Sequence, residues 1–91
     1  MEKLIAASEK QAEYGAECQD RVLSALWKRA WEDNNRDRAI ADSMKAKAET
    51  LFSDPRFLIV YPESNTAKFW IDQAKMPAMF VSRILSLIAQ Q

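Results

Sequence analysis

Histidine is absent from this 91-residue chain, and glycine and cysteine each occur only once, at Gly15 and Cys18. Without histidine there is no Ser-His or Cys-His nucleophile pair, no histidine metal ligand, and no side chain that changes charge near neutral pH. A single glycine excludes the common glycine-rich loops that hold phosphate groups. We therefore expect a protein that is not an enzyme and that uses no cofactor or metal.

The single Cys18 cannot form an internal disulfide, and its place among apolar positions predicts a small buried side chain. The chain has no run of about 18 consecutive apolar residues, which a membrane span requires. Its first residues, Met1 to Lys3, do not resemble a secretory signal. These features predict a reduced, cytoplasmic protein without a membrane segment.

Positive and negative charges balance, with 13 Lys and Arg against 13 Asp and Glu. A net charge of zero argues against a strongly basic nucleic-acid binder and against an acidic mimic of DNA. Residues 1–20 are mainly acidic and residues 21–47 mainly basic. This asymmetry either steers a partner or is ordinary charge on the surfaces of helices.

Two helices are predicted in the first half of the chain. Residues 3–32 have the spacing of a long amphipathic helix, and small residues dominate the first half of its apolar face. Asp33, Asn34 and Asn35 favour a break, although neither glycine nor proline enforces one, so an uninterrupted helix to Phe52 is the alternative. A second helix over 36–52 would then pack on the first as an antiparallel hairpin.

A β-hairpin is predicted next, followed by a third helix. Residues 56–61 are rich in β-branched and aromatic side chains between two prolines and predict a strand, and residues 67–72 predict its partner across a turn at 63–66. Both faces of this hairpin are apolar. Pro77 fits the first position of a helix that runs to Ala89 and is apolar over more than half its circumference.

These elements together predict one domain, residues 1–91, of the α+β class with the order α-α-β-β-α. Residues 1–53 form its helical hairpin, and residues 56–91 form the β-hairpin and the C-terminal apolar helix.

The apolar surface of the second half exceeds what we expect 91 residues to bury. The leading hypothesis is therefore a protein-interaction module that associates with itself, as a homodimer or higher oligomer, and with a further protein. Its size fits an adaptor or inhibitor of a larger assembly, such as those that phages and mobile elements encode. The candidate contact residues are Ile59, Tyr61, Trp70, Met79 and Leu85. For each of them taken singly, burial in the protein's own core is an equally good interpretation.

The alternative is a nucleic-acid-binding or regulatory protein that uses the basic segment 28–47. Two tryptophans one helical turn apart and adjacent bases would supply stacking and phosphate contacts. The rings could equally close the rim of the core while the bases are solvated. The candidate residues are Trp27, Lys28, Arg29, Trp31, Arg36 and Arg38. A row of acids at Glu9, Glu13 and Glu17 predicts a solvated face, because no histidine is present to complete a di-iron pattern.

Overall fold

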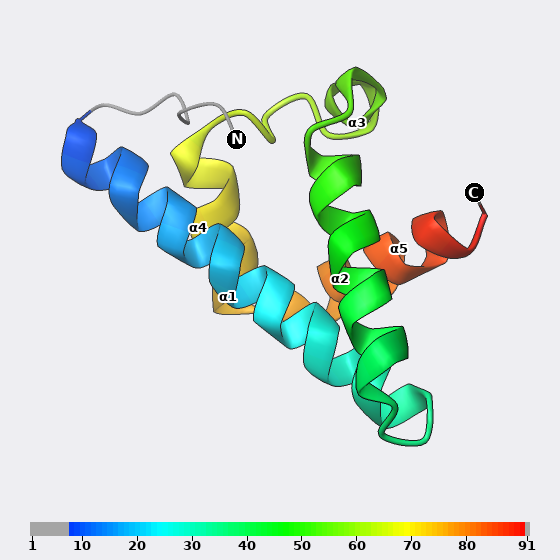
Figure 1. Ribbon diagram of the computed structural model, residues 1–91. Helices are drawn as coiled ribbons and strands as arrows, with labels where there is room; N and C mark the ends of the chain where they lie inside the picture. The colour runs from blue at the N-terminus through cyan, green and yellow to red at the C-terminus, as the bar shows by residue number, and fades with distance from the viewer. Residues whose placement is uncertain (1–7, 91) are drawn as a thin grey trace.

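The computed structural model describes residues 8–90, and no strand occurs within this range (Figure 1). The predicted α+β class is therefore wrong, because both segments of the expected β-hairpin, 56–61 and 67–72, lie largely in helices. The helices run over Glu9–Asp33 (α1), Arg38–Phe52 (α2), Pro55–Val60 (α3), Ala67–Lys75 (α4) and Pro77–Ala89 (α5).

Helix α1 begins at a capping residue. Ser8 is extended, and its hydroxyl oxygen accepts a hydrogen bond from the backbone N–H of Gln11 at 3.1 Å. The expected helix start at residue 3 lies outside the described residues. One face of α1 is buried along the helix, and seven of its residues belong to the predicted apolar face: Ala12, Gly15, Cys18, Val22, Leu23, Leu26 and Ala30. Gln19 is buried with them although it is polar.

The predicted break between the first two helices is confirmed. Asn35 and Arg36 both have left-handed backbone angles, with φ of 58° and 60°. The backbone N–H of Arg36 donates to the carbonyl of Trp31 at 2.8 Å, which closes the six-residue ring of a Schellman C-cap with Asn35 at its left-handed position. Asp37 then caps α2 by accepting from Ala39 N–H at 2.9 Å, so α2 starts at residue 38 and not at 36.

Residues 56–60 and 67–72 fold as helices because of their caps and their inward-facing rings. Asp54 caps α3, with Pro55 in the first turn, and Thr66 caps α4 by accepting from Phe69 N–H at 3.3 Å. Helical spacing directs Phe57 inward while the aliphatic residues after it stay exposed. The strand preference of β-branched residues depends strongly on context, and here packing of the rings overrides it.

A continuous cluster of six aromatic rings fills one side of the core. The rings come from α2, α3, the residue after α3, α4 and α5, and their centroid separations run from 4.8 to 6.5 Å. Neighbouring pairs are tilted, edge-on or stacked, the arrangements that aromatic side chains prefer. The six rings belong to Phe52, Phe57, Tyr61, Phe69, Trp70 and Phe80.

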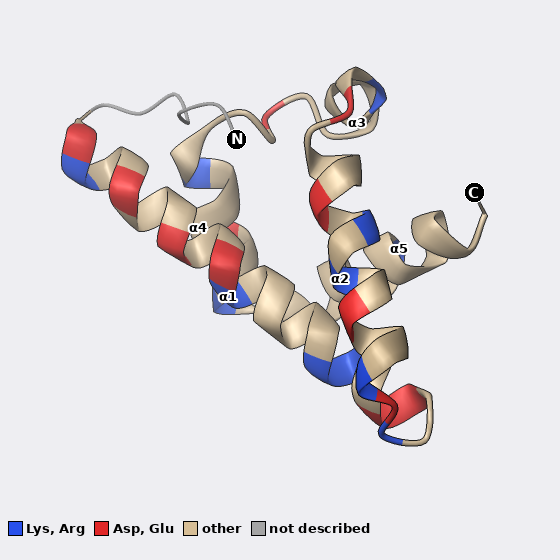
Figure 2. Cartoon of the chain, in the orientation of Figure 1, with Lys and Arg blue, Asp and Glu red and all other residues tan. Residues whose placement is uncertain are grey.

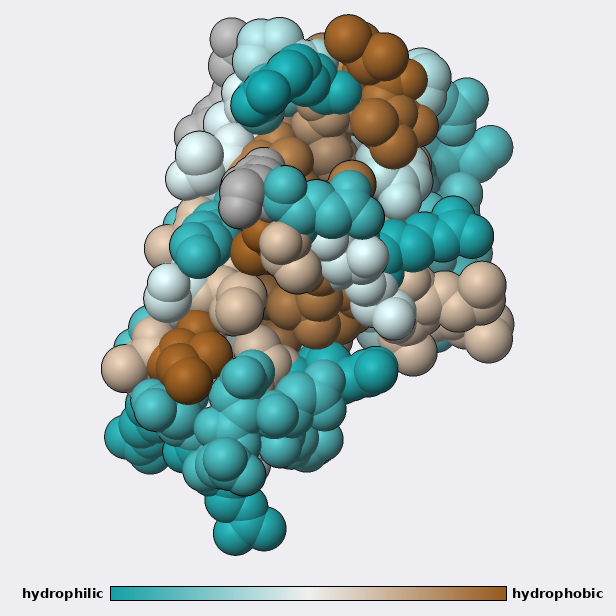
Figure 3. Space-filling model, turned by 90° about the vertical axis from the view of Figure 1, so that its right-hand side faces the viewer, coloured by the Kyte–Doolittle hydropathy of each residue, from teal (hydrophilic) through white to brown (hydrophobic). Residues whose placement is uncertain are grey.

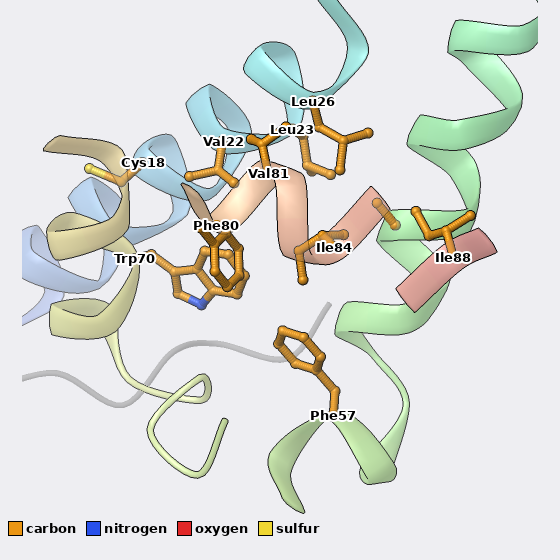
Figure 4. Close-up of a cluster of buried hydrophobic side chains, with 11 residues drawn as sticks. Cys18, Val22, Leu23, Leu26, Phe57, Trp70, Phe80, Val81, Ile84 and Ile88 are labelled. Carbon is orange, nitrogen blue, oxygen red and sulfur yellow. The ribbon is translucent and has the colours of Figure 1, made fainter. Parts of the chain in front are cut away.

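Aliphatic side chains from α1 and α5 complete the core (Figure 4). Helix α5 starts at Pro77 as predicted, and its inner side carries Phe80, Val81, Ile84 and Ile88. The predicted buried position of Cys18 is confirmed, since this free thiol lies inside the same cluster.

Helices α1 and α2 form a V in Figure 1, closed at the connection 34–37, and α4 and α5 lie behind it. Helix α1 packs against α4, α2 and α5, and α5 also packs against α2 and α4. The first two helices therefore contact each other as the hairpin prediction requires, but their arms diverge. Helix α3 lies at the open end of the V, with few contacts to the other helices.

Candidate protein-interaction surface

Helix α3 is a short helix fixed at both of its ends. Asp54 accepts a hydrogen bond from the backbone N–H of Arg56 at 2.9 Å, and the backbone N–H of Tyr61 donates to the carbonyl of Phe57 at 2.8 Å. Its six residues make too few internal bonds for a helix to persist alone in water. The rings of Phe57 and Tyr61, one turn apart and with centroids 5.0 Å from each other, attach it to the aromatic cluster.

Three consecutive aliphatic residues of α3 are exposed to solvent, at steps of about 100° around the helix. Leu58 is 41%, Ile59 79% and Val60 58% exposed. Figure 3 looks at the side of the molecule that is on the right in Figure 1. It shows strongly hydrophobic side chains at the top of this side, at the height of α3 in Figure 1. We call Leu58, Ile59 and Val60 the α3 face.

The ends of the α3 face carry charge. Arg56 precedes it, and Glu63 follows it in the turn toward α4. The guanidinium of Arg56 is paired with Asp54 at 2.8 Å, although 82% of the arginine side chain stays exposed. The hydrogen bond from this side chain, followed by that from the backbone N–H of Arg56, holds the pKa of Asp54 below its ordinary value of 3.8.

A second exposed apolar pair lies at the start of α5. Met76 is 82% and Met79 70% exposed, and the two are three residues apart. Lys75 and Arg83 flank them; Lys75 pairs with Asp72 at 3.8 Å, and α5 itself contains no acidic residue. Methionine is adaptable in contacts, but these two side chains are flexible and offer a less defined surface than the α3 face.

The five predicted partner-contact residues occupy different environments. Ile59 and Met79 are exposed, whereas Tyr61 and Leu85 are half-buried against the core. Trp70 is only 1% exposed, and its indole N–H donates to the carbonyl of Ser64 at 2.8 Å. Trp70 is thus a core residue in this structure, and only Ile59 lies on the α3 face.

Four exposed large apolar residues were missing from the predicted contact set: Tyr14, Leu58, Val60 and Met76. The strand predicted over 56–61 placed its aliphatic side chains on two opposite apolar faces, so Leu58 and Val60 were not grouped with Ile59. For Leu58 and Val60, the signal in the sequence is the pair Asp54 and Pro55. A capping residue followed by proline is typical of a helix start.

The predicted nucleic-acid residues gather at the corner between α1 and α2 (Figure 2). The rings of Trp27 and Trp31 stack at 6.0 Å, and the guanidinium of Arg36 lies 5.6 Å from the centre of the Trp31 ring. The indole N–H of Trp27 donates to Asp42 at 2.8 Å.

The bases at this corner are interspersed with acids. Arg29 pairs with Asp33 at 3.0 Å, and Asp37 lies between Arg36 and Arg38 in the chain. Lys28 and Arg38 are exposed. The two rings therefore already contact one another, one carries a cation, and the local positive charge is diluted.

Acidic residues lie on the first half of α1 and in a groove between α1 and α2. Glu9, Glu13 and Glu17 are exposed along the first half of α1, as predicted for a solvated face (Figure 2). An open groove between α1 and α2 is lined by Asp20, Leu23, Glu49, Thr50, Ser53, Asp54 and Pro55. Within residues 8–90, no three or more His, Cys, Asp or Glu side chains are grouped so that they would hold a metal ion.

Comparisons with protein-family models, with curated proteins and with solved structures each find no match to this chain. In the part of the chain that the structure describes, no helix has both the length and the apolar character needed to cross a bilayer. Any functional conclusion therefore depends on the surfaces described above.

Proposed function

We propose that this protein is a non-enzymatic protein-interaction module whose docking surface is the α3 face. The observation that carries the proposal is the exposure of three successive aliphatic residues, Leu58, Ile59 and Val60, on one short helix, with Ile59 the most exposed. Single exposed apolar residues are normal on any protein, but adjacent aliphatic residues leave apolar area in water that a partner would cover. An adaptor or inhibitor that docks onto a larger assembly works through a surface of this kind.

The local structure supports this role for the α3 face. Its neighbours Phe57 and Tyr61 are held by the aromatic cluster, so the backbone beneath the exposed residues is anchored. Branched side chains such as Ile59 and Val60 have few rotamers to lose, so ordering them on binding costs little. Arg56 and Glu63 provide a charged rim, as in many interfaces with an apolar centre.

The nucleic-acid alternative has less support from the corner between α1 and α2. Stacking with a base needs a free ring face, yet one face of Trp31 contacts Trp27 and Arg36 lies over the ring. Arg29 is paired with Asp33, which reduces the charge available for phosphate groups. A nucleic-acid site here would require these intramolecular contacts to break.

Affinity capture from native lysate with Ile59→Lys and Met79→Lys as matched variants tests the proposal. Both positions are exposed and apolar, so both variants are expected to fold, as far-UV circular dichroism would check. We expect proteins captured by the unmodified chain to be lost with Ile59→Lys and retained with Met79→Lys. Loss with Met79→Lys alone, or equal capture by all three chains, would contradict the proposal.

Binding to a fluorescent single-stranded oligonucleotide over a series of salt concentrations tests the alternative. Phosphate contacts weaken steeply as salt rises, whereas apolar contacts do not. Tight binding at physiological salt that is lost in a Lys28→Glu, Arg38→Glu variant would favour the nucleic-acid function. Lys28 and Arg38 are chosen for this variant because both side chains are exposed.

A further inference from the structure

We infer that the occupant of the α3 face is a second copy of this chain, with the two α3 helices packed antiparallel across a two-fold axis near Ile59. This inference rests on the proposed function, because it names the partner of the same surface. A two-fold contact places identical surfaces against each other, so the surface must be complementary to itself. Apolar residues at the axis satisfy this condition, and Leu58, Ile59 and Val60 carry no charge.

The charges at the ends of the α3 face fit the antiparallel arrangement. Arg56 lies before the face and Glu63 after it, so their charges are opposite along the chain. An antiparallel pair brings Arg56 of each copy toward Glu63 of the other, whereas a parallel pair would bring like charges together. Asp54 pairs with Arg56 at this end, but the Arg56 side chain is 82% exposed and that of Asp54 only 23%, so the guanidinium is the group that a second copy can reach. The Arg29 and Asp33 pair differs, since its acid is the more exposed partner.

The charge balance and shape of the protein permit such an approach. Copies with no formal net charge do not repel one another at long range. Helix α3 is at one end of the molecule in Figure 1, beyond the open end of the V, so two copies can bring these ends together. The Met76 and Met79 pair lacks such an arrangement, since α5 carries Arg83 but no acidic residue, and Lys75 before it is already paired with Asp72 at 3.8 Å.

The size of the α3 face sets the strength of the contact. Stable interfaces bury about 800 Å² on each partner, which takes some 20 residues a side. Three aliphatic residues and their rim contribute far less, so the dimer is weak and depends on concentration. It would be largely dissociated in dilute solution and would form when the local concentration of the chain is high, for example on a larger assembly.

Oxidative cross-linking of Ile59→Cys tests the position of the axis, with Met79→Cys as the matched control. Both new thiols are on exposed positions, and the native Cys18 is buried. A two-fold axis near residue 59 brings the two new sulfur atoms together, so we expect the Ile59→Cys disulfide dimer to form at least about tenfold faster at the same protein concentration. Equal rates for the two variants would overturn the inference.

Sedimentation equilibrium over a concentration series tests the contact without cross-linking. We expect a reversible monomer and dimer in the unmodified chain, at least about tenfold weaker association for Ile59→Lys, and no change for Met79→Lys. Glu63→Lys should weaken association, and Glu63→Lys with Arg56→Glu should restore it, because the swap exchanges both partners of the pair. An Ile59→Ser variant replaces Ile59→Lys if the lysine variant is unfolded by circular dichroism.

The outcomes separate this inference from the proposed function. A chain that stays monomeric at every concentration overturns self-pairing. If Ile59→Lys nevertheless loses a captured protein, the docking function of the α3 face stands with a different occupant. A dimer that Ile59→Lys does not weaken overturns the placement of the contact at α3.

Discussion

Trp70 and Ser64 are joined by a hydrogen bond of 2.8 Å in which the indole N–H donates to the backbone carbonyl of the serine. Both residues are buried, and they lie on opposite sides of the cap at Thr66. The bond therefore attaches the turn between α3 and α4 to the aromatic cluster. Through this turn, the position of α3 depends on a core residue of α4.

Replacing this indole tests the strength of the attachment. We expect Trp70→Phe to lower the free energy of unfolding by at least about 1–3 kcal/mol. The buried carbonyl of Ser64 loses its donor, and the smaller ring leaves space in the core. Trp31→Phe, at the half-buried corner, should change it by about 1 kcal/mol or less. Urea unfolding followed by far-UV circular dichroism measures both, and equal effects would argue against a structural role for the bond.

Truncating a buried side chain of α3 should reduce stability far more than truncating an exposed one. Phe57→Ala removes a buried ring and should cost about 3–5 kcal/mol of unfolding free energy. Ile59→Ala alters an exposed side chain and should change it by about 0.5 kcal/mol or less in dilute solution. In a strand, residues 57 and 59 would share one face, so comparable losses at both positions would favour the hairpin over the helix.

The left-handed C-cap at Asn35 predicts a preference for glycine. At a φ of 58°, glycine carries no steric penalty, so Asn35→Gly should maintain or raise stability. Asn35→Ala should be less stable than Asn35→Gly by about 1 kcal/mol or more, because a Cβ atom is disfavoured in this region. Thermal unfolding of the two variants side by side provides the comparison, and an equal melting temperature would contradict the cap geometry.

The Asp54 and Arg56 pair predicts a specific pH dependence. Because the folded-state pKa of Asp54 lies below 3.8, its carboxylate adds stability above that pH, and this stability is lost as the pH falls through the lower folded-state pKa. Arg56→Gln removes the largest cause of the shift, so the pKa of Asp54 should rise toward 3.8. Carboxyl NMR titration of both proteins measures this change, and added salt should reduce the shift because the Arg56 side chain is exposed.

The sequence was sufficient to predict the helices at the two ends of the described chain. Asp33 to Asn35 indicated the first break, and Pro77 indicated the start of α5, because local chemistry alone determines such caps. Residues 56–61 were wrongly predicted because β-branched and aromatic side chains prefer strands on average. Their helical state depends on rings of α2, α4 and α5, which are distant in sequence and carry no local signal.

The candidate surface was predictable only in part. Ile59 was selected and is exposed, but it was selected as a member of a hairpin face, so its neighbours Leu58 and Val60 were not chosen with it. Trp70 was selected because tryptophan is enriched at interfaces, a property that does not distinguish a surface ring from a buried one. The distinction requires the packing of α4 on α1 and α5, which no local pattern specifies.

The late position of α4 and α5 in the chain has a consequence for synthesis. Helix α1 is made before two of the helices that pack on it, α4 and α5, which follow α2 and α3 in the chain. A nascent chain that ends near residue 54 therefore displays Val22 and Leu26 without their covers, because chains are made from the N-terminus and fold as their parts appear. Until residues 67–89 are complete, we expect the growing polypeptide to expose apolar side chains of the kind that favour aggregation and chaperone binding.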